Sequence, residues 1–242
     1  LRWPGGIIAD WYDWRDGIGS DRDRRPPQYY GQWNAQWLSN DVGIDEVLQL
    51  CEALDIKPVI NVNWGTGTAE NAANFVEYVN GSTGTPWGSV RAANGHPSSY
   101  NVKFWEVGNE TWGVWTPGHT DAQTFANSYI TFRDAMIAKD PTIKLIAEGG
   151  DGNTSSQSWN TTMITTAGNR MDELAIHYYP PQGLPWAYSD NDVYRASVAA
   201  PVRIKNHLKA TQDVIINNSN EDIKIAVTEY NAMYFSSIDR RT

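Results

Sequence analysis

Short apolar runs alternate with longer amphipathic segments along the whole chain. Most of the short runs are rich in apolar and β-branched residues and are bounded by turn-forming or polar residues, which is the pattern of β-strands. Because apolar residues in most of them are nearly continuous, we expect these strands to be buried on both faces. The predicted strands cover residues 1–3, 57–63, 102–109, 143–149, 173–179 and 223–230.

The segments between these runs repeat their apolar residues at helical spacing. In the first of them, four residues fall on one face of a helix, namely Val47, Leu50, Cys51 and Leu54. Regular alternation of strand and helix predicts parallel strands that are joined by crossover helices. The predicted helices cover residues 44–55, 69–80, 121–140, a shorter piece near 156–167, and a long one within 191–217.

Most of the predicted strands end in polar or aromatic residues that a buried core does not favour. An open doubly wound sheet would gather such residues at one switch point. A (β/α)₈ barrel instead carries them at the carboxyl ends of many strands, where the loops build a single site. Their distribution therefore favours an α/β fold of the TIM barrel type. The residues are Asn61, Asn63, Asn109, Glu110, Glu148, His177, Tyr178, Tyr179, Glu229 and Asn231.

The barrel is expected to be incomplete in this chain, because only about six βα units are visible where a barrel has eight. We interpret residues 1–242 as a single catalytic domain, a fragment or processed core. The Gly- and Pro-rich segment 81–97 predicts a long loop on the active face. Six strands alone would expose two sheet edges, so we expect stability only where neighbours cover them. A sharp cooperative melting transition of the isolated monomer would contradict that expectation.

Composition narrows the choice of partners. The chain has a formal net charge of -9, and its 19 Lys and Arg residues are mostly scattered, so we expect no nucleic-acid partner. No apolar stretch is long enough to span a membrane, so we expect no membrane partner either. The 12 Trp and 12 Tyr residues favour carbohydrate, because flat aromatic rings stack on the apolar faces of sugars.

Metal and cofactor chemistry find no support in the sequence. The single Cys51 excludes an internal disulfide, and the four His residues show no ligand spacing. The Gly-rich segment NWGTGT lacks the Lys of a phosphate-binding loop. We therefore expect no metal and no cofactor. The compartment stays open between extracellular and cytoplasmic, with the extracellular one favoured.

Two glutamates, Glu110 and Glu229, close predicted strands on opposite walls of the barrel. Glu110 ends the segment WEVGNE, and Glu229 ends IAVTE. Two carboxylates that face each other across a sugar-sized cleft can hydrolyse a glycoside, because one protonates the leaving oxygen while the other attacks the anomeric carbon. Each alone could equally be a salt-bridged rim residue. The pairing favours the catalytic reading.

Several segments, spread from Leu1 to about Asn231, carry a resemblance to a known family. They are LRWPGG, WYDWRDGIG, RRPP, NWGTGT, NGHPSSYNVKFWEVGNE and TEYN. In this order and spacing they resemble glycoside hydrolase family 51 of clan A, whose best-known members are retaining α-L-arabinofuranosidases. The resemblance implies that the visible strands are barrel strands two to seven, that Glu110 is the acid/base and that Glu229 is the nucleophile. It further implies an oligosaccharide or polysaccharide substrate from plants and association into a homo-oligomer.

The resemblance also assigns substrate-binding residues. Asn109 matches the residue that hydrogen-bonds the sugar hydroxyl next to the anomeric carbon, and Arg2 matches the one that keeps the nucleophile ionised and oriented. His177 and Tyr179 match the His-x-Tyr pair of barrel strand six, whose Tyr hydrogen-bonds the nucleophile.

Three tryptophans flank the predicted mouth and could stack on substrate, although core packing explains each nearly as well. They are Trp64, Trp112 and Trp115.

Two positions depart from the family pattern. Ile7 stands where the family has an Asn that grips arabinose, and Thr228 stands where it has an Asp. An apolar Ile7 cannot replace lost sugar hydrogen bonds, so the glycone stays open. The family also draws substrate contacts from barrel strands one and eight, which this chain lacks. An endo-β-1,4-glucanase on the same scaffold and a catalytically inactive carbohydrate-binding remnant therefore remain as alternatives.

Overall fold

Six parallel strands form the central sheet of the computed structural model, which describes residues 1–22, 28–30, 36–151, 156–183 and 189–234. Each strand pairs in parallel with its neighbour in chain order, and each lies within or overlaps one of the predicted runs. The predicted strands are therefore confirmed. In spatial order they are β1 (Arg2–Trp3), β4 (Val59–Val62), β5 (Phe104–Val107), β6 (Lys144–Asp151), β7 (Glu173–Tyr178) and β9 (Lys224–Tyr230).

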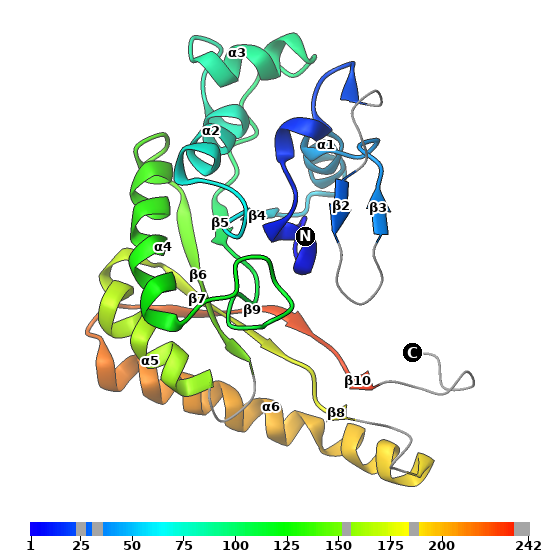
Figure 1. The fold of residues 1–242 in the computed structure, drawn as a ribbon, viewed down its shortest axis with the longest axis vertical. Helices are drawn as coiled ribbons and strands as arrows, with labels where there is room; N and C mark the ends of the chain where they lie inside the picture. Colours follow the sequence, from blue (N-terminus) through cyan, green and yellow to red (C-terminus); the bar gives the residue numbers. More distant parts are fainter. Residues whose placement is uncertain (23–27, 31–35, 152–155, 184–188, 235–242) are drawn as a thin grey trace.

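The long helices lie in an arc outside this sheet, each between two consecutive strands (Figure 1). Parallel strands wrapped by crossover helices make part of a (β/α) barrel, as the sequence predicted. None of the helices in the described ranges has the length and apolar content of a membrane span. The helices are α1 (Ile44–Leu54), α2 (Ala69–Asn80), α4 (Ala122–Ile137), α5 (Ser156–Ala167) and α6 (Asp190–Asn218).

Shorter elements fill the connections. After β1 the chain forms two 3-10 helices and an antiparallel hairpin before it reaches α1, and two further short strands pair beside the carboxyl ends of β7 and β9. The segment RRPP, residues 24–27, lies outside the described residues. These elements are η1 (Ile7–Asp10), η2 (Trp14–Gly17), β2 (Gln28–Tyr30), β3 (Gln36–Leu38), η4 (Gly168–Arg170), β8 (Gln182–Gly183) and β10 (Met233–Tyr234).

Helix α4 illustrates how the sequence builds the outer layer. The Asp121 side chain caps its amino end by accepting two backbone N–H groups of the first turn. Phe125, Tyr129, Phe132 and Met136 recur at helical spacing and are buried against the core. Burial of each such side chain contributes about 1.5–3 kcal/mol, so this face fixes the helix against the sheet.

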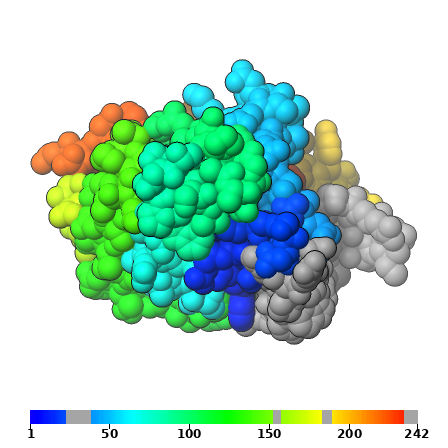
Figure 2. Space-filling view, turned by 90° about the horizontal axis from the view of Figure 1, so that it is seen from above, coloured from blue at the N-terminus to red at the C-terminus, as the bar shows by residue number. Residues whose placement is uncertain are grey.

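The segment 81–97 is not the loop on the active face that we predicted. It contains helix α3 (Pro86–Ala93), which begins with the capping side chain of Thr85 and a proline at its first position. It follows the carboxyl end of α2 and leads to the amino end of β5, whereas the site lies at the carboxyl ends of the strands. Seen from above, α3 lies on the outside of the molecule (Figure 2). Its Arg91 is buried and donates to the carbonyl oxygens of Tyr78 and His96, which holds α3 against α2.

Candidate active site

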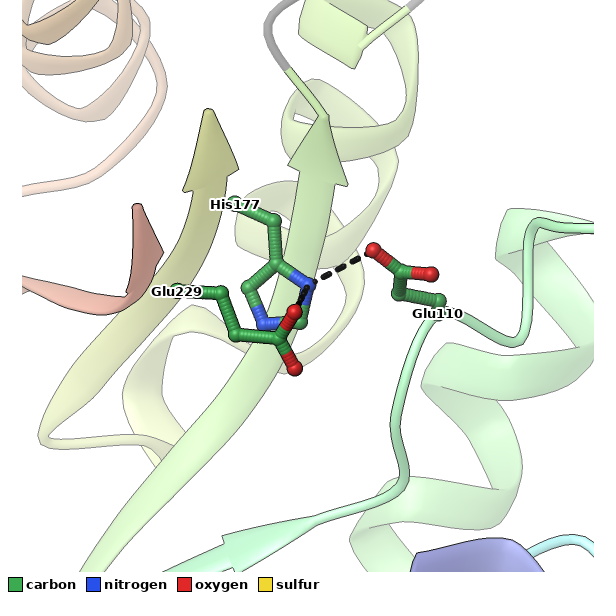
Figure 3. Close-up of side chains that lie close together, drawn as sticks. All are labelled: Glu110, His177 and Glu229. Carbon is green, nitrogen blue, oxygen red and sulfur yellow. Dashed lines mark hydrogen bonds and ion pairs between the residues drawn. The ribbon is translucent and has the colours of Figure 1, made fainter. Parts of the chain in front are cut away.

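Three ionisable side chains meet at the carboxyl ends of β5, β7 and β9 (Figure 3). Glu110 follows β5, His177 lies in β7, and Glu229 lies opposite His177 in β9. One ligand atom from each lies within 4.8 Å of those of the other two. His177 Nδ1 is 2.9 Å from Glu110 Oε1 and 3.6 Å from Glu229 Oε2. The structure therefore brings the two predicted catalytic glutamates together around His177.

A cavity of about 600 Å³ opens over these residues. Five further residues that the sequence singled out lie in its wall, namely Asn109, Trp112, Trp115, Tyr179 and Ile7. This volume is within the range of about 300–1,000 Å³ that small-molecule sites have. Other residues in the wall, which the sequence did not single out for the site, include Gly6, Asp151, Gln182 and Met233.

Arg2, which lies in β1, donates hydrogen bonds to three acceptors. Its Nη1 donates to Glu229 Oε1 at 2.6 Å, and its Nη2 donates to Asn109 Oδ1 at 2.8 Å. Its Nε donates to Glu106 Oε2 at 2.5 Å, and Glu106 is only 1% exposed. Glu106 lies in β5 and is not among the residues that the sequence analysis singled out. The guanidinium thus balances a buried carboxylate and orients the predicted nucleophile at once.

We expect Arg2→Met to lower the free energy of unfolding by about 3–5 kcal/mol, because it leaves the Glu106 carboxylate buried without a cation. Urea denaturation of the variant at neutral pH measures the loss. The double variant Arg2→Met with Glu106→Gln is the matched control, and it should recover part of the stability because it removes the buried charge. A loss below about 1 kcal/mol in the single variant would show that Glu106 does not depend on Arg2.

The environment of Glu229 favours its ionised form. Burial is the largest single effect and raises the pKa of this carboxyl, whereas the charges of His177 and Arg2 lower it. Hydrogen bonds from the Tyr179 hydroxyl to Oε2 and from Arg2 to Oε1 act in the same direction. The net result is a pKa below the ordinary value for Glu, as a nucleophilic carboxylate requires.

Asn109 and Glu110 lie on a turn with unusual backbone angles. The φ angles are 75° at Gly108 and 52° at Glu110, both in the left-handed region that L residues seldom adopt. A Cβ at position 108 would lie 3.0 Å from the Phe125 ring, so a glycine is required there. The Glu110 conformation costs on the order of 1–3 kcal/mol, which surrounding contacts must offset.

Asn109 is held from two sides. Its side-chain oxygen accepts from Arg2, and its backbone N–H donates to Asp10 Oδ2 at 2.8 Å. Its amide nitrogen Nδ2 has no hydrogen-bond partner among the described residues. Because buried donors in folded proteins are nearly always satisfied, this nitrogen in the cavity wall is suited to a substrate oxygen.

Asp10 is a buried residue of the site that the sequence analysis missed. Besides Asn109 it accepts the backbone N–H groups of Trp64 at 2.8 Å and Gly65 at 2.9 Å through Oδ1. Burial raises its pKa to about 6, although the three N–H donors oppose that shift. Asp10 thereby ties η1 to the turns that follow β4 and β5. Its only sequence signal is an acidic residue directly after the apolar run IIA.

The predicted aromatic residues divide into two groups. Trp112 and Trp115 line the cavity, their rings 5.4 Å apart and edge to face. The Trp115 indole N–H donates to Glu110 Oε2 at 2.8 Å, a direct contact that the sequence did not indicate. Trp64 is outside the cavity wall, because its ring packs on Phe125 and its N–H donates to Ser128 at 2.9 Å. The geometry gives no support to stacking of Trp64 on substrate.

The two departures from the family pattern both lie at the site. Ile7 presents an apolar side chain to the cavity where the family has an Asn. Thr228 places its hydroxyl oxygen 3.0 Å from His177 Nε2, so a neutral partner fixes the imidazole that faces Glu110.

One group of described residues has the spacing of metal ligands, and it is Glu110, His177 and Glu229 themselves. Both carboxyl groups already accept hydrogen bonds, from Arg2 and Tyr179 on one side and from Trp115 on the other. The positive guanidinium of Arg2 also disfavours a second cation there. The absence of a metal and a cofactor stays a prediction.

Two glutamates across a cavity at the carboxyl ends of parallel strands are the arrangement of barrel glycoside hydrolases. The family model described as the alpha-L-arabinofuranosidase 1 domain matches residues 1–197, and the chain belongs to this family. The resemblance found in the sequence is confirmed.

Individual relatives agree with this family. A probable α-L-arabinofuranosidase C from Aspergillus clavatus is 32% identical over 224 residues, which are 89% of this chain and 42% of the relative. An intracellular exo-α-L-arabinofuranosidase from Bacteroides ovatus is 31% identical, over 94% of this chain and 44% of the relative. The chain spans less than half the length of these two proteins.

Solved structures show the same relation. The crystal structure of an α-L-arabinofuranosidase from Thermotoga maritima, in complex with arabinose, is 34% identical with a TM-score of 0.86. It covers 98% of this chain, which corresponds to 47% of that protein. The family 44 endoglucanase Cel44A from Clostridium thermocellum has a TM-score of 0.66 at 13% identity, which is a likeness of fold alone.

Proposed function

We propose that the protein is a retaining glycoside hydrolase that removes α-L-arabinofuranosyl residues from plant polysaccharides. The observation that carries the proposal is the separation of Glu110 and Glu229, whose facing carboxyl oxygens lie within 4.8 Å. Retaining enzymes hold their two carboxyl groups roughly 5–5.5 Å apart, and inverting enzymes hold them roughly 6.5–9.5 Å apart to admit a water. The family and its arabinofuranosidase relatives support the choice of glycone.

In the first step, Glu229 attacks the anomeric carbon and Glu110 gives its proton to the glycosidic oxygen. The bond to the leaving alcohol breaks as the bond to the Glu229 carboxylate forms, which leaves a covalent glycosyl-enzyme. The lowered pKa of Glu229 keeps it ionised for this attack. Arg2 and Tyr179 bind its two oxygens and so fix its direction.

In the second step, Glu110 is a carboxylate and acts as a base. It takes a proton from the water that attacks the same carbon, the bond to Glu229 breaks, and the sugar leaves with its original configuration. His177 at 2.9 Å and the Trp115 N–H at 2.8 Å hold the two oxygens of Glu110 through both steps. The free amide nitrogen of Asn109 is placed to donate to the sugar hydroxyl beside the reacting carbon.

The substrate class is tested by a short panel. We expect release of the aryl group from an aryl α-L-arabinofuranoside and no cleavage of soluble β-1,4-glucan. Cleavage of the glucan alone would replace the proposal with the endo-glucanase alternative, which the apolar Ile7 in the cavity wall permits. Binding of arabino-oligosaccharides without turnover of either substrate would identify the inactive carbohydrate-binding remnant.

Tyr179→Phe should move the acid limb of the kcat/KM profile to higher pH by about one unit. In the parent, the hydrogen bond from Tyr179 lowers the pKa of Glu229. Its removal raises that pKa, so a larger fraction of Glu229 is protonated at acidic pH. The profile of an aryl arabinofuranoside measured from pH 3 to 8 shows the shift. Tyr178→Phe, at the neighbouring residue that packs on His207, is the control and should leave the limb in place. A limb that stays or moves to lower pH in Tyr179→Phe would contradict the assigned contact.

A further inference from the structure

A second buried carboxyl group lies behind the turn that carries Glu110. Glu148 in β6 is 3% exposed, and neither of its carboxyl oxygens has a hydrogen-bond partner among the described residues. A Cβ added at Gly108 would lie 3.2 Å from Glu148 Oε2, so the side chain lies directly against this turn. The hydroxyl of Thr111, at the end of the same turn, is buried and equally without a partner in the described structure.

The surroundings of Glu148 disfavour the ionised form of its carboxyl group. Burial is the main cause that raises the pKa of Glu148 well above its ordinary value, and the charges of Asp10 and Glu110 add to it. The N–H and hydroxyl of Thr111 oppose the shift but do not outweigh it. A buried acid beside the charge of Asp10 keeps its proton, and a protonated carboxyl group can donate as well as accept.

Asp10 also contacts this turn, but as an acceptor of hydrogen bonds. It accepts three backbone N–H groups and has the donors that a carboxylate needs, whereas Glu148 has none that meets hydrogen-bond geometry. Two neighbouring acids that cannot both ionise at low cost separate into one charged and one neutral member. Their environments decide which is which.

We propose that Glu148 is a positioning residue for the general acid: it stays protonated, offers its O–H to Thr111, and with the carboxylate of Asp10 clamps the turn that holds Glu110. This role rests on the proposed function, since it acts through Glu110. The clamp explains how Glu110 keeps its left-handed φ of 52° without a glycine.

Within the described residues, none of the main effects on the pKa of Glu148 comes from a cation. The neighbouring strands contribute Glu106 from β5 and His177 from β7, and both already have partners in Arg2 and Glu110. Helix α5, which packs outside β6, meets this strand with the neutral side chains of Trp159 and Asn160. The negative charge of Asp10 therefore acts on Glu148 without an opposing partner from these elements.

The pH dependence of stability tests the protonation of Glu148 without any need for turnover. A raised folded pKa means that the contribution of the group to stability is complete below its unfolded pKa, near pH 4.3, and is lost as pH rises towards the folded pKa. Glu148→Gln has the same shape and cannot ionise, so it avoids this loss. Its Tm should equal that of the parent near pH 4 and exceed it by roughly 5 °C at pH 8.

The electrostatic coupling between Glu148 and Asp10 allows a second test of the proposal. In the Asp10→Asn background, the gain in Tm from Glu148→Gln at pH 8 should be smaller, because one of the charges that disfavours ionised Glu148 is gone. A Tm gap that is independent of pH, or a Glu148→Gln variant that is less stable than the parent at pH 8, would overturn the proposal. An equal gain in Tm in both backgrounds would show that Asp10 has no part in the proposal.

Steady-state kinetics test the positioning role of Glu148. Glu148→Leu cannot donate to Thr111, so kcat should fall roughly 10-fold with KM nearly unchanged, and Glu148→Gln should recover most of that loss. Equal losses in the two variants would overturn the role. A parent protein without turnover would defeat the proposed function, whereas the melting curves would still decide the state of Glu148.

Discussion

Glu229→Gln should abolish turnover of an aryl α-L-arabinofuranoside, with kcat lowered by roughly 10⁴-fold or more. The amide keeps the shape of the side chain but cannot attack the anomeric carbon, and no other described carboxylate is placed to replace it. Of the described carboxyl groups, only Glu110 and Asp151 share the cavity wall with Glu229. Release of the aryl group, followed by absorbance under single-turnover conditions, measures the loss.

Glu221→Gln is the matched control, because Glu221 is exposed and lies outside the cavity. It should retain the activity of the parent. Binding of an arabino-oligosaccharide to Glu229→Gln, measured by calorimetry, should persist, which separates loss of chemistry from loss of structure. Turnover in Glu229→Gln within tenfold of the parent would exclude Glu229 as the nucleophile.

Glu110→Ala should lower kcat by about 10²–10⁴-fold for a substrate with a poor leaving group, because protonation of the glycosidic oxygen is lost. An activated aryl glycoside needs no such proton, so its first step should be much less affected and the glycosyl-enzyme should accumulate. Added azide fits the space that the carboxylate vacates and needs no base. It should restore turnover and give the α-arabinofuranosyl azide.

The dependence on the leaving group is what distinguishes an acid/base from a residue that only shapes the site. A substrate series of falling leaving-group pKa should show a steep dependence in Glu110→Ala and a shallow one in the parent. Equal losses across the series, with no rescue by azide, would contradict the role assigned to Glu110.

The strand order and the pair of glutamates were predictable because local signals carry them. Most strands are visible in the sequence as short apolar runs. A parallel barrel brings the carboxyl ends of its strands to one face, so two glutamates at strand ends are expected to share a site. Helix α3 was missed because the segment 81–97 is rich in Gly and Pro. Its start signals, Thr85 as cap and Pro86 at the first position, were nevertheless present in the sequence.

The roles of the buried acids behind the site could not be predicted in the same way. Asp10, Glu106 and Glu148 come from three different strands or connections, and each role depends on what faces it: three N–H groups, a guanidinium, or an unpartnered hydroxyl. No spacing along the chain encodes those contacts. The sequence left Trp64 open between the mouth and the core for a related reason, since a strand-end tryptophan can turn either into the mouth or onto the neighbouring helix.

The stereochemistry of transfer tests the central claim most directly. Hydrolysis of an aryl α-L-arabinofuranoside in the presence of methanol traps the glycosyl-enzyme as a methyl glycoside, whose anomeric configuration no longer equilibrates and can be read by proton NMR. Double displacement through Glu229 predicts the methyl α-L-arabinofuranoside, with no such product in Glu229→Gln. Formation of the β-anomer would contradict the account, because it requires direct attack across a wider pair of carboxylates.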